Sequence, residues 1–164
     1  MNHLHRLFFF SLYLIWYLCP IFALSSSSAQ AVELAVIVSV RSEVSTLRAD
    51  QVADIFLSQS NRFPNGSEAV AIDQNLGSPL RDEFYGKVAR RSPALIKAHW
   101  SRLIFTGRAQ PPAEVDGNAA VRKLIADNPG MIGYIERAAL DPSVRAVLIV
   151  RLRGMLVKYP AARA

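Results

Sequence analysis

The stretch "VAIDQNLGSPLRDEFYGKV", residues 70–88, decides the fold, because it shows a strand that gives way to a helix across a short polar loop. The apolar run at 68–73 predicts a short strand. Ser78 followed by Pro79 is typical of a helix start: the hydroxyl caps the helix, and proline lacks an N–H that the first turn leaves unpaired anyway. Apolar residues then recur every four positions and predict one buried stripe, made of Leu80, Phe84 and Val88.

The segments on either side continue this alternation of strand and helix. Residues 32–40 ("VELAVIVSV") are rich in β-branched residues and apolar on both faces, which predicts a central strand of the parallel type, covered on both sides. Residues 47–59 place apolar side chains near helical spacing and predict a helix capped by Ser45 or Thr46. A second Ser-Pro pair, at residues 92–93, predicts another helix start.

The remainder of the chain predicts one more helix and two more strands. Residues 108–117 are a proline-rich loop, residues 118–130 predict a helix, and residues 131–136 and 144–152 predict strands with room for only a helical turn between them. The order is strand, helix, strand, three helices, strand, strand. It predicts an α/β fold with a mainly parallel sheet flanked by helices, in which ligands bind beyond the carboxyl ends of the strands.

The first 31 residues are expected to be an export signal. A short basic start precedes an apolar run of 18 residues at 7–24, and Ala-Gln-Ala at 29–31 offers the small-residue pattern that signal peptidase accepts. The alternative is an uncleaved signal that anchors the protein in the inner membrane, because the run is long enough to span a bilayer. We expect residues 32–150 to form one lobe and residues 151–164 a basic C-terminal tail.

Charge and cysteine content limit the classes of function. Removal of the signal takes away Arg6 and no acidic residue, which leaves 18 basic against 13 acidic residues. This mild excess fits an anionic ligand or an acidic membrane surface. The basic residues are scattered and no basic run alternates with aromatics, so nucleic acid is not an expected partner. The only cysteine, Cys19, lies in the signal, which excludes disulfides and thiol chemistry from the exported part.

Catalytic patterns are missing from the sequence. His99 is the only histidine after the signal, and its place in a helical apolar stripe predicts a core residue and not a catalytic or metal-binding one. The chain has no Gly-x-Ser-x-Gly elbow, no Ser-x-x-Lys pair and neither of the standard nucleotide-binding glycine loops. We therefore expect no enzyme activity, no cofactor and no metal.

The step from Asp73 to Arg81 is the candidate binding feature. A strand that ends in a short loop before a helix leaves backbone N–H groups unpaired, here at Ser78, Leu80 and Arg81, and such a helix end can bind phosphate or sulfate. The Ser78 hydroxyl and the Arg81 guanidinium could add to it. The alternative is a simple capped helix with a surface arginine, and the local sequence leaves both open.

Four segments, taken in order, resemble the second lobe of the periplasmic phosphate-binding proteins of ABC transporters. They are "VIVSV" (36–40), "ADQVADIFLSQSNRFPNGS" (49–67), "VAIDQNLGSPLRDEF" (70–84) and "NPGMIGYI" (128–135). The resemblance covers about residues 34–135 and is strongest to the short, single-lobe members of this type II periplasmic-binding-protein superfamily. It implies that the Gly-Ser helix start occupies the position at which such a lobe holds its anion.

The departures from the family pattern imply a weak site. The family's arginine, serine, glycine and threonine at the anion step fall here on Gln74, Ser78, Pro79 and Leu80. One charge and one hydroxyl are lost, and proline removes a backbone donor. Complete binding proteins also clamp their anion between two lobes, of which we expect this chain to supply one.

The resemblance implies an exported phosphate-type anion-binding protein, a low-affinity component or sensor related to phosphate ABC transport. The alternative is a non-catalytic interaction module of the cell envelope with a vestigial anion site. Expected partners are phosphate or a similar small anion, a transporter, sensor or envelope protein, and possible second copies of the chain. The implied site consists of ligand contacts and of residues that orient the loop: Gly77, Ser78, Leu80 and Arg81 in the first group, Asp73 and Gln74 in the second.

Overall fold

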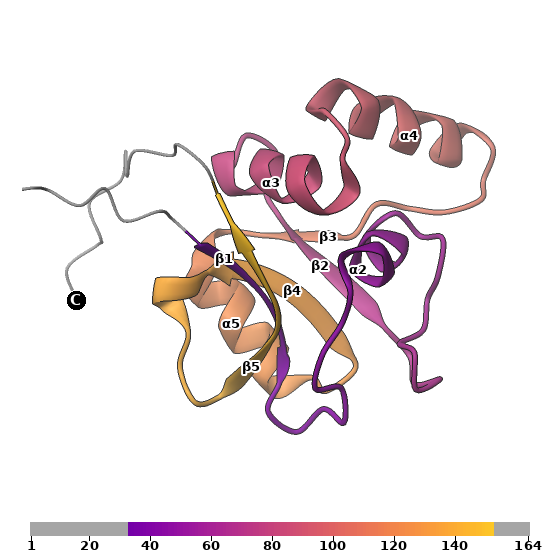
Figure 1. Ribbon diagram of the computed structural model, residues 1–164. Coiled ribbons are helices and arrows are strands. Elements are labelled where there is room, and N and C mark those ends of the chain that lie inside the picture. Colours follow the sequence, from indigo (N-terminus) through magenta and orange to yellow (C-terminus); the bar gives the residue numbers. More distant parts are fainter. Residues whose placement is uncertain (1–32, 153–164) are drawn as a thin grey trace, which may run out of the picture.

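The computed structural model describes residues 33–152, which form one sheet with helices on both faces (Figure 1). The strands are β1 (Glu33–Ser39), β2 (Val70–Gln74), β3 (Ala113–Val115), β4 (Met131–Glu136) and β5 (Val144–Arg151). The helices are α2 (Ala49–Phe56), α3 (Pro79–Phe84), α4 (Pro93–Phe105) and α5 (Gly117–Asp127), together with the π-helical turn η1 (Tyr85–Ala89) and the 3-10 turn η2 (Arg137–Ala139). The predicted α/β fold class is confirmed.

The sheet is mixed, with strand order β3-β2-β4-β1-β5. β2 is parallel to both β3 and β4, whereas β1 is antiparallel to both of its neighbours, β4 and β5. Four strands therefore point one way and β1 points the other. The expectation of a parallel-type strand at 32–40 was wrong in its pairing and right in its burial. An unbroken apolar run in a strand indicates that both faces of the strand are covered, but it does not indicate whether the neighbouring strands are parallel or antiparallel.

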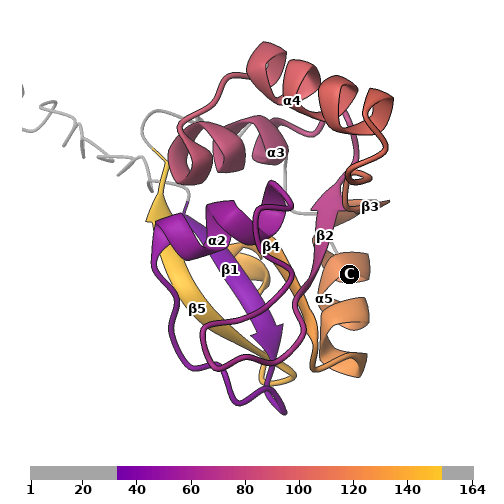
Figure 2. The ribbon, with the colours of Figure 1, turned by 90° about the vertical axis from the view of Figure 1, so that its right-hand side faces the viewer.

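Alternate residues of β1 divide the core between the two faces of the sheet. Leu34, Val36 and Val38 pack in the larger cluster with α2, and Ala35 and Ile37 pack in the smaller cluster with α5. All five side chains are fully buried. Figures 1 and 2 show α2 and α5 on opposite sides of the sheet, as this alternation requires.

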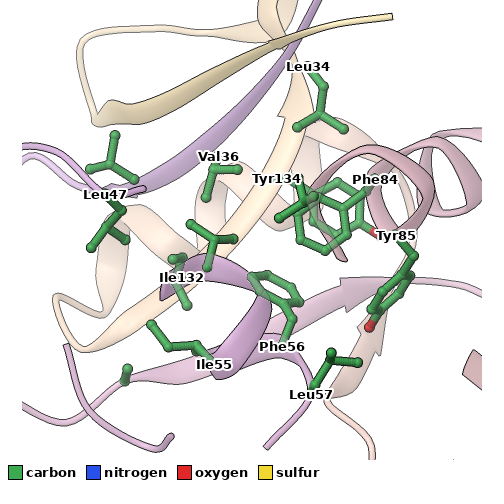
Figure 3. Close-up of a cluster of buried hydrophobic side chains, with 14 of the residues drawn as sticks. Leu34, Val36, Leu47, Ile55, Phe56, Leu57, Phe84, Tyr85, Ile132 and Tyr134 are labelled. Atoms are coloured by element: carbon green, nitrogen blue, oxygen red, sulfur yellow. The ribbon is translucent and has the colours of Figure 1, made fainter. Parts of the chain in front are cut away.

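The helical stripe predicted after Pro79 packs on the larger core. Leu80, Phe84 and Val88 are all buried, although the last of them lies in η1 and not in a continued α-helix. The Phe84 ring stacks on Tyr134 at 4.0 Å between centroids and meets Phe56 of α2 edge to face at 4.6 Å. Figure 3 shows these rings where α2, the α3–η1 segment and β4 converge. The cluster fixes α3 against the sheet and so fixes the loop that precedes it.

Several local expectations need correction. Helix α2 is capped by Arg48 and not by Ser45 or Thr46; the backbone N–H of Arg48 donates to the Gln51 side chain. The loop expected at 108–117 contains the edge strand β3, whose short length hides it in a proline-rich sequence. At the far end, β5 continues through Arg151 and Leu152 is fully buried.

Some expectations lie outside the described residues. The export signal at 1–31 and all but the first two residues of the tail at 151–164 fall there, and both stay predictions. Within residues 33–152, every helix is too short or too polar to cross a membrane.

Candidate functional site

The candidate site lies where the carboxyl end of β2 turns into α3, beside the edge strand β3 (Figure 2). The turn passes through Gly77 at φ +91°, a left-handed conformation that glycine adopts without a steric cost. Ser78 then begins α3 with Pro79 in its first position, as the sequence predicts. The Ser78 side chain does not cap the helix; its hydroxyl donates to the Gln74 side-chain oxygen at 3.2 Å.

Arg81 is the cation of this site, and it points inward. Its Nε donates to Asp73 Oδ2 at 3.0 Å, and the two side chains are 7% and 0% exposed. The Arg81 guanidinium therefore does not lie at the open end of the helix, and Arg81 is not the surface arginine of the alternative interpretation. Because a buried charge must be paired, the Arg81 side chain turns inward, toward the Asp73 carboxylate at the end of β2.

Two tyrosines complete the surroundings of Asp73. Tyr85 donates to Asp73 Oδ2 at 2.8 Å, Tyr134 donates to Oδ1, and the Gln74 backbone N–H donates to the same oxygen at 2.9 Å. Burial raises the pKa of the Asp73 carboxyl, while the Tyr134 hydrogen bond, the charge of Arg81 and the Tyr85 hydrogen bond lower it. Burial and the negative charge of Asp73 raise the pKa of both tyrosine hydroxyls, so these groups remain donors.

Glu114 of β3 supplies a second carboxylate. Its Oε1 lies 3.5 Å from Arg81 Nη1, and its Oε2 accepts the backbone N–H of Leu76 at 3.1 Å. The side chain is 35% exposed and lies at the rim of the site. Glu114 thus links the Leu76 backbone N–H to the Arg81 guanidinium.

Three further polar groups near the loop also have partners within the chain. The Gln74 amide nitrogen donates to Asn118 Oδ1 and to the Tyr134 carbonyl oxygen, both at 3.2 Å. The N–H groups of Ser78 and Arg81, which the sequence left unpaired, donate to the carbonyls of Asn75 and Ser78 at 3.0 Å.

The structure therefore brings all six predicted residues together, but in two layers. Asp73, Gln74 and Arg81 are buried and bonded to one another or to the sheet, while Gly77 and Ser78 lie nearer the surface. Leu80 packs in the core and offers only its backbone. The single guanidinium of the loop is thus already paired with two carboxylates, Asp73 and Glu114.

The sequence did not indicate four further members of the site: Tyr85, Glu114, Asn118 and Tyr134. The spacing of four between Arg81 and Tyr85 places both on one helical face and was a usable signal. Glu114 and Tyr134 gave none, because they reach the site through the pairing of β3 and β4 with β2.

His99 lies apart from this site and is a core residue, as predicted. It is 7% exposed, and its Nε2 donates to the Leu57 carbonyl oxygen at 3.0 Å. Its ring meets Trp100 edge to face at 5.0 Å. Across residues 33–152, no group of three or more His, Cys, Asp or Glu side chains is placed to hold a metal ion.

These features define a class: a mixed α/β lobe with a strand-to-helix polar loop, as in periplasmic-binding-protein folds. No protein-family model matches the chain, and neither does any curated protein. Among solved structures the chain is similar to phosphate ABC transporter substrate-binding proteins, which confirms the resemblance predicted from the sequence.

One similar structure, from Clostridium perfringens, is described as a phosphate ABC transporter substrate-binding protein with bound phosphate. It is 25% identical with a TM-score of 0.56, over 71% of this chain and 45% of that one. An ABC-type phosphate transport receptor from Vibrio cholerae is 20% identical with a TM-score of 0.56, over 71% and 46%. PstS from Borrelia burgdorferi is 14% identical with a TM-score of 0.54, over 79% and 50%. The chain spans about half the length of the structures it matches.

Proposed function

We propose that this protein binds a small inorganic anion, phosphate in the first instance, at the loop that joins β2 to α3. In this role it is a low-affinity component or sensor related to phosphate ABC transport. The observation that carries the proposal is a buried arginine, Arg81, just beyond the carboxyl end of β2. The fold around it is shared with a 25% identical protein that was solved with bound phosphate. The ligand contacts are Gly77, Ser78, Arg81 and the backbone of Leu80, with Asp73 and Gln74 holding the loop.

Low affinity follows from the charges at the loop. Arg81 faces Asp73 and Glu114, so the three groups together carry a net negative charge before any ligand arrives. Gln74 stands where the resemblance implies an arginine, and its amide is bonded to Asn118 and Tyr134. A charge-assisted hydrogen bond contributes about 1.5–3 kcal/mol, so the missing cation alone weakens binding by roughly ten- to a hundredfold.

A calorimetric titration with phosphate, and with sulfate as the competing anion, tests the proposal. We expect weak heat in the millimolar range for the natural chain. Glu114→Gln removes the carboxylate at the rim and should tighten binding by about tenfold, because one like charge close to the anion in a half-solvated site is worth about 1–2 kcal/mol.

The matched control is Glu68→Gln. Glu68 is an exposed carboxylate at the opposite, amino end of β2, so its removal makes the same change in net charge away from the loop. Equal affinities of the two variants, or no heat from either at millimolar phosphate, would remove the binding proposal.

The second candidate function is a non-catalytic interaction module of the envelope. One observation favours it: the polar side chains of Asp73, Gln74, Ser78 and Arg81 all have partners within the fold. Light scattering on the purified protein tests self-association, and a strict monomer at high concentration would contradict pairing between copies. Under either function we propose a binding protein and not an enzyme, since the similar structures are described as binding proteins and a transport receptor.

We also propose a periplasmic location, reached through the predicted signal at residues 1–31. Cell fractionation with mass analysis of the mature N-terminus is the test. A start near Val32 supports cleavage, whereas an intact chain in the membrane fraction supports the anchored alternative.

A further inference from the structure

Helix α4 is the most exposed helix of the fold. It lies outside α3, on the far side of α3 from the sheet, in both views (Figures 1 and 2). Its contact with the body runs mainly through η1 and is made by the buried side chains of Ile96, His99 and Trp100, with Leu103 partly buried. The rest of its surface is open to solvent.

The outer side of α4 carries a stripe of small side chains that ends in Phe105. At 100° per residue, four positions fall within about 60° of one line directly opposite the buried side chains. They are Ala94, Ala98, Ser101 and Phe105. Phe105 is 93% exposed, whereas Leu95 and Ile104, at 56% and 47% exposed, lie about 90° from the stripe on opposite sides of the helix. An almost fully exposed phenylalanine on a projecting helix is a large apolar surface left in water, which points to a binding role.

The segment that contains α4 is basic. Residues 85–112 contain six basic residues and no carboxylate: Lys87, Arg90, Arg91, Lys97, Arg102 and Arg108. In the part of the chain that the structure describes, none of the six forms an ion pair; the pairs present there involve other arginines. Lys97 and Arg102 lie on α4 about 70° to either side of the stripe. Of these six, Lys97 and Arg102 lie on α4, Lys87 lies in η1, and Arg90, Arg91 and Arg108 lie in the loops before and after α4.

We propose that the outer face of α4 docks on an anionic membrane surface. Phe105 enters the boundary between headgroups and acyl chains, and Lys97 and Arg102, one on each side of it, meet the lipid phosphates. An exposed aromatic side chain between two cations with long stems suits a helix that lies in the plane of a bilayer. The face is convex and belongs to a projecting helix. It therefore suits a flat, deformable lipid surface better than an acidic protein, which would need a matching groove.

A local probe tests this docking without interference from the apolar run at 7–24. The full chain carries one cysteine, so Cys19→Ser together with Ala98→Cys gives a single site for an environment-sensitive nitrobenzoxadiazole label in the middle of the stripe. Vesicles of phosphatidylglycerol and phosphatidylethanolamine should brighten the label and shift its emission to the blue. Vesicles of phosphatidylcholine alone should not. The matched control carries the label at Lys123→Cys, an exposed position on α5 across the sheet, and should stay unchanged.

Charge and apolar variants then separate the contributions. Lys97→Gln with Arg102→Gln should reduce docking by about twenty-fivefold, because each cation near an anionic surface contributes about fivefold. Phe105→Ser should reduce it by about tenfold through the lost apolar burial, and about 0.5 M salt should reverse the electrostatic part.

No response at position 98, an equal response at position 123, or indifference to the charge variants would each overturn the proposal. A response at position 98 to poly-glutamate but not to anionic vesicles would also overturn it and would assign α4 to an acidic protein partner.

Discussion

Replacing Arg81 by Met tests how much this residue contributes to the stability of the fold. Methionine fills much of the same volume, so the main change is the loss of the cation beside Asp73, whose side chain is 0% exposed. Removing one partner of a buried ion pair costs about 3–5 kcal/mol, since the other charge is left without compensation. The Tyr85 and Tyr134 hydroxyls and the Gln74 N–H still donate to the carboxylate, which places the expected loss toward the lower end of that range.

Protonation of Asp73 sets an upper limit on this loss. A carboxyl with an ordinary pKa of 3.8 costs about 1.36 kcal/mol per pH unit to protonate, or about 4.4 kcal/mol at pH 7 and about 1.6 kcal/mol at pH 5. In the variant the folded-state pKa of Asp73 lies further above its unfolded value. A raised folded-state pKa gives stability that is present at low pH and is lost as pH rises through it. The deficit of the variant is therefore about 3–4 kcal/mol at pH 7 and at most about 1.6 kcal/mol at pH 5.

Urea denaturation followed by circular dichroism, at both pH values, measures this deficit. The matched control is Arg48→Met, which breaks an ion pair whose side chains are 71% and 62% exposed and should leave the unfolding free energy within experimental error. A loss below about 1 kcal/mol at pH 7 would refute the reasoning, as would a deficit that does not shrink at pH 5.

Three further predictions concern packing, capping and ligand binding. Gly133→Ala should destabilise by about 1–3 kcal/mol in thermal or urea unfolding, because its new methyl would lie 2.9 Å from Val121 Cγ1. Ser92→Ala should cost about 1 kcal/mol, since this hydroxyl caps α4, whereas Ser78→Ala should cost less because its hydroxyl makes no cap bond; parallel urea titrations compare them. Sulfate binding, followed by calorimetry, should tighten as pH falls from 7 to about 5, because the raised pKa of Asp73 lets protonation release Arg81; a flat profile would contradict this.

The sequence predicted the helices and strands well where one local rule governs them. Ser78-Pro79 and Ser92-Pro93 do begin helices, and the apolar run at 131–136 is a strand. Two elements were not predicted. β3 has only three residues in a proline-rich segment, and it is held by pairing with β2. The turn η1 departs from α-helical spacing within a continuous helical pattern, which residue preference alone does not reveal.

The candidate site divides in the same way. Its position was predictable, because consecutive residues, together with the order of the flanking motifs, indicate the helix start after β2. Its state of charge was not. Whether Arg81 faces an incoming anion or a buried carboxylate depends on Glu114 and Tyr134, which lie 33 and 53 residues farther along the chain.

The sequence by itself determined the alternation of strands and helices, the burial of β1 on both faces and the place of the polar loop, because each depends on short-range spacing. Only the tertiary structure decided the direction of β1 and the partners of Arg81. It also left Phe105 of α4 exposed between Lys97 and Arg102. These features arise from pairing and burial between segments that are distant in the sequence. Whether a charge is paired or exposed depends on neighbours in space, which a local sequence pattern does not predict.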